Sequence, residues 1–174
     1  MNKVTIPGMT TIVVSETTPV PVERVLAAAA DFTARRGDVF PAVSAKHTTV
    51  HAITGTSADV TEGTRVGPLV IWERCDYDWS TAGSVTAAVT DSNVYAPGSS
   101  WHLTAVPTPD GSRIEMSWVR RFKHNPRGIL FGTAFRIIGG PMFRRYAKQI
   151  VANLESLEAS DSFALRSAHG NRRS

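Results

Sequence analysis

The chain has 174 residues, a length typical of one globular domain that can bury a hydrophobic core without a disulfide or a metal. Hydrophobic residues make up 42% of it and charged residues 20%, which excludes a disordered or fibrous protein. The formal net charge of +4 is spread unevenly, because residues 1–115 hold 8 basic and 12 acidic side chains whereas residues 116–154 hold 8 basic and none that is acidic.

The basic segment 116–154 has two interpretations. It is either a solvated surface that lies near the acidic part of the same chain, or a face that meets an anionic surface or an acidic carrier protein. Nucleic acid is not the partner we expect. Arg144, Arg145 and Lys148 lie beside a helical core stripe, without the exposed aromatic side chains that single-strand binders use.

The single cysteine, Cys75, cannot form an internal disulfide and has no partner for a zinc or redox pair, so we expect it to be buried and inert. The first seven residues lack the apolar run of a signal peptide. The uncharged stretches 128–135 and 137–143 of the expected C-terminal helix are far shorter than the ~20 apolar residues that cross a membrane. The sequence therefore predicts a cytoplasmic protein with no membrane span.

Residues 10–17 are largely β-branched and are followed by prolines, which predicts a strand. A helix is expected over 22–32, because Pro21 suits its first turn, and a short helix or turn over 34–43. From 47 to 121, segments rich in Val, Thr, Ile, Trp and Tyr alternate with turn signals at Gly55, 62–63, 82–83, 97–98 and 109–111. This spacing predicts a meander of five or six antiparallel strands.

After Pro126 the apolar residues recur at helical spacing, as Phe143, Tyr146, Ile150, Leu154 and Leu157 show. The Gly-Gly-Pro sequence at 139–141 is expected to kink this helix or to split it. Periodicity ends near residue 160. We therefore expect one domain over 1–159, followed by a flexible basic tail over 160–174.

This order of elements is accompanied by five short motifs. They are P-V-P-V-E-R-V-L-A-A-A-A-D-F-T at 19–33, D-V-F-P-A-V at 38–43, W-E-R-C-D-Y-D-W-S at 72–80, D-S-N-V-Y-A-P-G-S-S-W at 91–101 and D-G-S-R-I-E-M-S-W-V-R-R at 110–121. Together they resemble the START-like, or SRPBCC, superfamily, and most of all its bacterial members described as polyketide cyclase/dehydrase. The resemblance covers residues 10–158.

The resemblance implies an α+β helix-grip fold. In this fold a curved antiparallel sheet of about six or seven strands surrounds a long C-terminal helix, two short helices follow the first strand, and an apolar cavity lies between sheet and helix. Members bind lipids, sterols, polyketides or other hydrophobic molecules, and a minority are enzymes. We expect no metal and no cofactor, because His47 and His51 are too far apart along a strand to share a metal and no dinucleotide, phosphate-loop or nucleophile motif is present.

Two charges fall on strand faces that are otherwise apolar. In 69–79 the odd positions form the apolar face and Glu73 is its only charge, and in 114–122 the same holds for the even positions and Arg120. Since an unpaired buried charge costs several kcal/mol, we expect both to point into the cavity and either to pair or to hold the polar end of a ligand. A bulge that turns one of them outward, or a salt bridge without a ligand role, is the alternative.

Aromatic side chains complete the expected ligand site. Strand alternation directs Tyr77, Trp79, Trp101 and Trp118 inward, and the resemblance places Phe40 at the cavity mouth. The same resemblance implies that the C-terminal helix closes the cavity with Ile138, Met142, Phe143, Tyr146 and Ile150. Flat rings suit a sterol or a polyketide, although each ring by itself is also an ordinary core residue.

We therefore expect a protein that binds, transports or sequesters a small hydrophobic ligand such as a lipid, sterol or polyketide. The first alternative is a polyketide aromatase/cyclase or dehydratase-type enzyme. Asp78, Trp79 and Ser80 stand where such enzymes carry an arginine, so catalysis would have to use Glu73 as a general base and Arg120 to stabilise an enolate. The second alternative is an interaction module that uses the basic face 116–154.

Overall fold

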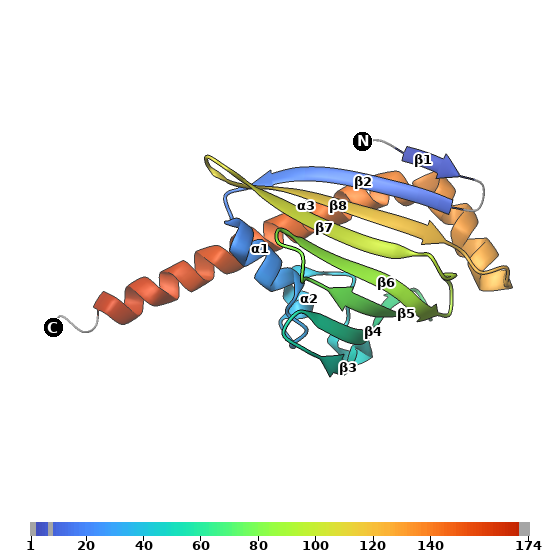
Figure 1. Cartoon of the computed structure of the whole chain (residues 1–174), viewed down its shortest axis with the longest axis horizontal. Helices are drawn as coiled ribbons and strands as arrows, with labels where there is room; N and C mark the ends of the chain where they lie inside the picture. Colours follow the sequence, from blue (N-terminus) through green and yellow to red (C-terminus); the bar gives the residue numbers. More distant parts are fainter. Residues whose placement is uncertain (1–2, 7–8, 171–174) are drawn as a thin grey trace.

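One antiparallel sheet makes up most of the fold, and the computed structural model describes residues 3–6 and 9–170 (Figure 1). The sheet has eight strands in the order β1-β2-β8-β7-β6-β5-β4-β3. They are β1 (Lys3–Ile6), β2 (Met9–Thr18), β3 (Thr49–Ile53), β4 (Ser57–Val66), β5 (Leu69–Asp78), β6 (Ser84–Ser92), β7 (Ser100–Thr108) and β8 (Gly111–Arg121). Strands β3 to β8 confirm the predicted meander and β2 the predicted first strand, whereas β1 is an addition that the sequence pattern does not predict.

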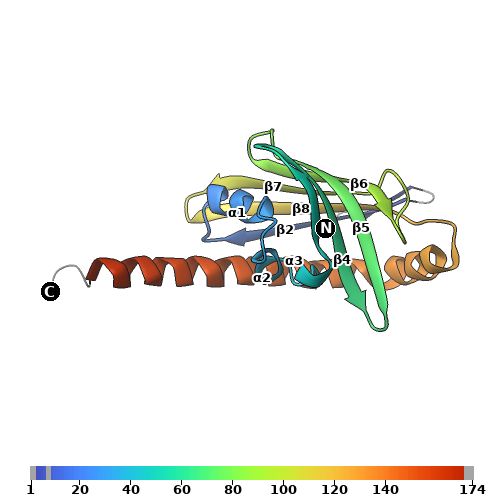
Figure 2. The ribbon, with the colours of Figure 1, turned by 90° about the horizontal axis from the view of Figure 1, so that it is seen from below.

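The helical segments are α1 (Val22–Ala29), α2 (Arg36–Val39), the 3-10 turn η1 (Ala45–His47) and α3 (Pro126–Gly170). Figure 2 shows α3 running along one face of the curved sheet. α1 contacts β7, and α2 contacts α3. This arrangement confirms the expected α+β helix-grip fold, with its short helices between β2 and β3.

Alternation along the strands puts the core on the sheet face that meets α3. In β8 every second residue is buried: Ser112, Ile114, Met116, Trp118 and Arg120. Ile12 of β2 lies opposite Trp118 in the register, and Ile150 of α3 is buried in the same core. Burying a large aliphatic side chain of this kind stabilises the fold by about 1.5–3 kcal/mol, so the sheet and α3 hold each other in place.

Four of the five predicted turns are confirmed, at Gly55, Gly83, Gly98 and Gly111. The turn expected at 62–63 is wrong, because both residues lie inside β4 and the chain reverses at Gly67, which has a φ of 59°. Gly63 has a different reason to be glycine. A Cβ there would lie 2.6 Å from the Cβ of His47, so its missing side chain lets η1 pack against β4.

The C-terminal helix is continuous through 139–141, with Pro141 inside it. Figure 1 shows the ribbon of α3 changing direction after its first turns, so the predicted kink is confirmed and the predicted split is not. The helix runs on to Gly170, which makes residues 160–170 of the expected tail helical, and residues 171–174 lie outside the described residues. Within residues 3–6 and 9–170, no helix is both long and apolar enough to cross a membrane.

Candidate functional site

A cavity of about 390 Å³ lies between the sheet and α3. This volume falls within the range of about 300–1,000 Å³ that small-molecule sites occupy. Its walls come from strands β4 to β8, from α2 and the segment that follows it, and from the first half of α3. The lining residues include Phe40, Thr64, Ile71, Glu73, Cys75, Tyr77, Tyr95, Trp101, Trp118, Arg120, Phe122, Phe135, Ile138, Met142, Phe143 and Tyr146.

Aromatic rings form two groups around the cavity. In the first, Trp118 packs on Phe143 with ring centroids 4.5 Å apart, and Phe143 in turn contacts Phe135 at 5.3 Å. In the second, Trp101 lies edge-on to Phe40 at 5.9 Å and close to Tyr77 at 6.3 Å. Because Trp101 and Trp118 face each other on β7 and β8, the two groups meet in the middle of the sheet. Rings held in this way offer a large, flat apolar contact surface.

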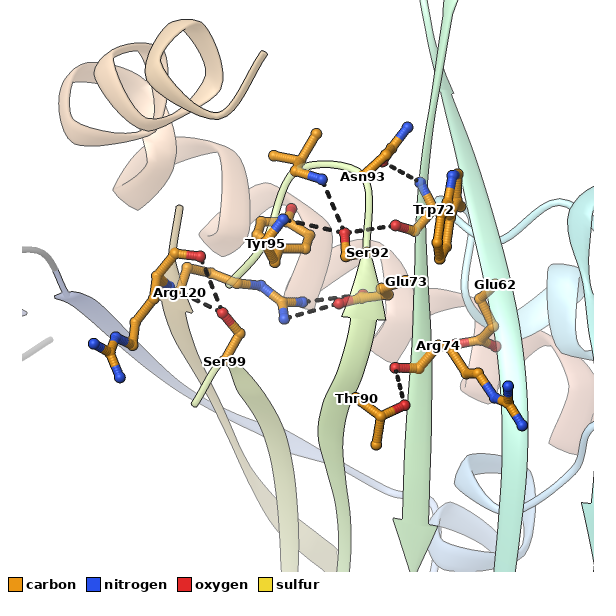
Figure 3. Close-up of polar contacts among 12 residues, drawn as sticks. Glu62, Trp72, Glu73, Arg74, Thr90, Ser92, Asn93, Tyr95, Ser99 and Arg120 are labelled. Carbon is orange, nitrogen blue, oxygen red and sulfur yellow. Dashed lines mark hydrogen bonds and ion pairs between the residues drawn. The ribbon is translucent and has the colours of Figure 1, made fainter. Parts of the chain in front are cut away.

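Glu73 and Arg120 form an ion pair at the cavity wall, as Figure 3 shows. Arg120 donates from Nη1 to Glu73 Oε2 at 3.0 Å and from Nη2 to Oε1 at 3.3 Å. The Arg120 side chain is 6% exposed and that of Glu73 is 23% exposed. Both therefore point inward, as the strand alternation predicts, and the expected pairing is confirmed.

Arg120 is held in place by the Tyr95 ring and the Glu73 carboxylate. Its guanidinium carbon lies 4.5 Å from the centre of the Tyr95 ring, and both terminal nitrogens donate to Glu73. Nη1 and Nη2 each keep a second N–H, because a guanidinium has five, and Nε is buried and makes no hydrogen bond within the described part of the chain. Since Glu73 is the more exposed partner, the polar group that the pair presents to the cavity is the carboxylate.

A second buried cluster, which the sequence analysis misses, joins Arg36, Glu62 and Tyr77. Arg36 donates from Nε to Glu62 Oε1 and from Nη2 to the Tyr77 hydroxyl at 3.1 Å, while that hydroxyl donates to Glu62 Oε2. Arg36 Nη1 also donates to the Ala29 carbonyl at 3.0 Å. All three members of the cluster are buried. Burial and the neighbouring Glu62 raise the pKa of Tyr77 far above its ordinary value, so its hydroxyl keeps its proton.

The two clusters meet where Glu62 of β4 lies directly opposite Glu73 of β5. Both side chains line the cavity, so two carboxylates and two guanidiniums balance each other on one wall. Burial raises the pKa of the Glu73 carboxyl above its ordinary value, and the charge of Glu62 adds to this rise while Arg120 opposes it. A carboxyl of this kind accepts hydrogen bonds when ionised, and it can take up a proton more readily than a carboxyl in water.

Two further hydroxyls belong to the cavity, those of Tyr95 and Tyr146. Burial raises the pKa of both tyrosines, so both hydroxyls remain protonated and can donate a hydrogen bond. Tyr146 projects from α3 against Trp118, with the ring centroids 6.2 Å apart. The cavity thus combines apolar walls with a small number of polar groups, which is the usual composition of a small-molecule site.

Eight of the nine expected ligand-site residues line this cavity: Phe40, Glu73, Tyr77, Trp101, Trp118, Arg120, Phe143 and Tyr146. The ninth, Trp79, is not among its lining residues. It follows the last residue of β5, where strand alternation no longer applies, and it packs near Phe32 and donates from Nε1 to the Gly55 carbonyl at 3.0 Å. On α3, Ile138 and Met142 line the cavity as expected, whereas Ile150 is buried in the core behind it.

Cys75 is buried in the cavity wall, and this burial raises the pKa of its thiol far above the ordinary value. The expectation of a buried cysteine is confirmed. The described residues contain no group of three or more His, Cys, Asp or Glu side chains that could hold a metal ion.

Sequence signals for the missed residues do exist. Glu62 continues the inward alternation of Ala58 and Val60, but the glycine after it suggests a turn. Arg36 lies four residues from both Phe32 and Phe40, and its guanidinium carbon is 4.4 Å and 4.7 Å from the centres of their rings. An arginine between two aromatic residues at helical spacing is the pattern that indicates such a cation–π stack.

Comparison with known proteins shows similarity at the level of fold. No family model matches the sequence, and no curated protein matches it. Among solved structures, the protein TTHA0849 from Thermus thermophilus is similar with a TM-score of 0.68 and 16% identity, over 86% of this chain and 99% of the other.

Two further structures are similar over most of their own length. A START superfamily protein from Mycobacterium smegmatis has a TM-score of 0.56 and 13% identity, over 85% of this chain and 94% of that one. The Zhui aromatase/cyclase from Streptomyces sp. R1128 has a TM-score of 0.60 and 14% identity, over 85% of this chain and 92% of that one. At these identities the similarity shows the fold alone, which is the START-like helix-grip fold.

Proposed function

We propose that this chain, which has the START-like fold, binds a small and largely apolar ligand that carries a hydroxyl or a similar hydrogen-bond donor. The observation that carries the proposal is the cavity of about 390 Å³, whose aromatic walls surround the carboxylate of Glu73. Similarity in fold to a START superfamily protein and to an aromatase/cyclase supports a ligand-binding role.

The apolar walls supply the binding free energy. Each 100 Å² of apolar ligand surface that leaves water contributes on the order of 2.5 kcal/mol before the entropy of immobilisation is subtracted. Trp101 and Trp118 lie side by side on neighbouring strands, so they favour a ligand with a flat or ring-shaped body. A sterol and an aromatic polyketide both fit this description, whereas an acyl chain would rely on the apolar walls alone.

The polar wall determines the orientation of the ligand. Arg120 uses both terminal nitrogens on Glu73, and Arg36 is occupied by Glu62, Tyr77 and the Ala29 carbonyl. Of the two carboxylates on this wall, that of Glu73 is the more exposed, so it is the acceptor that a ligand reaches more easily. A ligand hydroxyl that donates to Glu73 would be bound more tightly than an otherwise identical molecule that lacks it.

A second candidate function is a cofactor-independent enzyme of the cyclase or dehydratase type. The raised pKa of Glu73 favours it, because a general base works best when its pKa approaches the operating pH. In such a reaction Glu73 would remove a proton from a carbon next to a carbonyl. The Tyr95 or Tyr146 hydroxyl would then donate to the oxygen on which negative charge develops.

Native mass spectrometry of the freshly purified chain, before and after denaturation, tests the binding proposal. We expect a mass shift that disappears on denaturation and an apolar molecule in the organic extract. Titration of the emptied protein with a fatty acid, a sterol and an aromatic polyketide should then change the fluorescence of Trp101 and Trp118. A protein that carries nothing and responds to none of the three classes would overturn the proposal.

A pair of variants on α3 shows whether binding uses this cavity. Ala134 lines the cavity and Ala152 is exposed on the same helix, so Ala134→Phe should abolish binding while Ala152→Phe should leave it unchanged. Glu73→Gln separates the two functions. A binding protein would keep ligands that need no ionised acceptor, whereas an enzyme would lose turnover while still binding its substrate.

A further inference from the structure

The first turns of α3 expose an unusual number of large apolar side chains. Five of the nine large hydrophobic residues that are exposed in the described part of the chain lie there: Ile129, Leu130, Ile137, Ile138 and Met142. Ile137 is 74% exposed and Leu130 is 63% exposed. We refer to these five residues as the exposed apolar face. Large apolar surfaces on a globular domain mark sites that bind a partner or a membrane.

Basic side chains accompany this face. Helical spacing places Leu130 and Ile137 on one side of α3, two turns apart, and Arg144 and Lys148 continue along that side. Arg127 precedes Leu130 by three residues. The sequence has no acidic residue anywhere from 116 to 154. An apolar stripe with cationic neighbours and no acidic ones is the pattern of a helix that lies in a membrane interface.

The exposed apolar face also borders the cavity. Ile138 and Met142 belong to the face and line the cavity, so they form one rim of its mouth. Val66, at the end of β4, lines the cavity too and is 44% exposed. The sheet side of the cavity thus also has an exposed apolar residue.

We propose that the exposed apolar face docks onto a lipid bilayer that contains anionic phospholipids, with the cavity mouth turned toward the membrane. The apolar side chains would enter the interface between headgroups and acyl chains, and the basic side chains would meet phosphate groups. A second copy of this chain fits the face less well, because two faces with only basic charges would repel each other.

With the cavity mouth turned toward the membrane, docking would allow a ligand to be exchanged between the cavity and the bilayer. An apolar ligand that leaves the cavity at this rim would pass into the bilayer without exposing its surface to water. This last step rests on the proposed ligand binding, but the docking itself does not, since it depends only on the surface of α3. The two proposals can therefore fail separately.

Vesicle flotation of the full chain tests the docking. We expect binding to vesicles of one part phosphatidylglycerol and two parts phosphatidylcholine, and binding at least about tenfold weaker to phosphatidylcholine alone, since each basic residue near an anionic surface contributes about fivefold in affinity. Binding should also weaken as salt is added. A wild-type chain that floats with neither vesicle would overturn the proposal.

Two double variants with matched controls separate the apolar and the basic contributions. Leu130 and Ile137 do not line the cavity, so Leu130→Ser with Ile137→Ser should weaken vesicle binding about tenfold or more. Ile53→Ser, at a residue on β3 that is 58% exposed, should have no effect. Arg127→Gln with Lys148→Gln should weaken binding about tenfold, and Arg113→Gln on the outer face of β8 should not.

Several outcomes would overturn the docking. If the serine pair floats like the wild type, the apolar face does not enter the bilayer. If the wild type prefers an acidic carrier protein or a nucleic acid to the anionic vesicles at the same salt concentration, the partner is not a membrane. Fluorescence titration of the serine pair with a soluble ligand should match the wild type, and this comparison distinguishes failed docking from a failed cavity or a failed fold.

Discussion

Glu62 and Glu73 lie directly opposite each other on β4 and β5, and both face the same cavity. Like charges at directly opposed positions destabilise a sheet, and neither carboxylate reaches bulk water easily. The structure compensates with one arginine for each: Arg36 binds Glu62, and Arg120 binds Glu73. The wall is therefore close to neutral as a whole, although each of its members would be costly without its partner.

The two pairs differ in what they can do. Arg36 and Glu62 are both nearly inaccessible, and Tyr77 occupies the remaining oxygen of the carboxylate. Both oxygens of Glu62 are engaged within this buried cluster, which joins α2 to β4 and β5. Glu73 remains partly open to the cavity. We therefore assign a structural role to the first pair and a ligand-facing role to the second.

Replacing Arg36 with methionine should destabilise the fold strongly. The variant leaves Glu62 buried without its cation, and breaking a buried pair in this way costs about 3–5 kcal/mol. The free energy of unfolding in urea measures the loss. Arg74→Met is the matched control, because the Arg74 pair with Asp59 is exposed to solvent and should contribute far less to stability. Equal losses in the two variants would contradict the role given to Arg36.

The raised pKa of Glu73 makes its contribution to stability depend on pH. Because the folded carboxyl binds its proton more tightly than the unfolded one, the folded state holds more protons between the ordinary pKa of 4.5 and the raised value. In that window the contribution of Glu73 to the free energy of unfolding falls as pH rises. It is largest below 4.5 and is lost once pH exceeds the raised pKa.

Glu73→Gln removes this titration while the other carboxyls remain. The free energy of unfolding of the wild type, measured relative to that of Glu73→Gln, should therefore increase as pH is lowered from neutral toward 4.5. Urea titrations of both proteins at a series of pH values give this difference directly. A difference that stays constant, or that decreases toward acid, would show that the pKa of Glu73 is not raised.

Gly63→Ala should destabilise the chain although glycine inside a strand is normally unfavourable. The added Cβ would lie 2.6 Å from the Cβ of His47, so η1 would have to move away from β4, at a cost of about 1–3 kcal/mol. Gly55→Ala is the control, because nothing lies within 4 Å of a Cβ at that turn. Urea unfolding of both variants measures the difference. A stabilised Gly63→Ala protein would show that the close approach of η1 is dispensable.

Much of this arrangement could be predicted because it depends on local pattern. Alternation along β5 and β8 is sufficient to identify Glu73 and Arg120 as inward charges, since each is the only charge on its apolar face. Their pairing follows from the energetic cost of leaving either one alone. Alternation does not predict the position of Trp79, because this residue stands one position beyond the end of β5, where the chain leaves the sheet.

The missed residues depend on contacts between distant segments. Gly63 suggests a turn in the sequence, but it is glycine because His47, sixteen positions earlier, packs against it. That interpretation ends the strand too early and hides the inward position of Glu62. Arg36 becomes a buried residue only when α2 is placed against β4 and β5, and the spacing of Phe32 and Phe40 around it indicates a ring contact but not this burial. Tertiary packing, rather than local propensity, decides these positions.

Trp118→Phe and Trp79→Phe should separate the cavity from the surface in ligand binding. Trp118 lines the cavity between Phe143 and Tyr146, so a ligand that enters should quench or shift its fluorescence. Trp79 lies outside the cavity and donates to the Gly55 carbonyl. We expect Trp79→Phe to retain the full fluorescence response of the wild type, and Trp118→Phe to lose a large part of it.

The affinity for the ligand should also be lowered by Trp118→Phe and not by Trp79→Phe. Trp118→Phe keeps an aromatic ring but removes part of the contact area, so ligand binding should weaken by about tenfold, which corresponds to about 1.4 kcal/mol. Isothermal titration calorimetry measures this change without relying on tryptophan, and urea unfolding verifies that both variants are folded. If Trp79→Phe weakens binding as much as Trp118→Phe does, the ligand lies outside the cavity between the sheet and α3. In that case Glu73 would no longer be the residue that orients it.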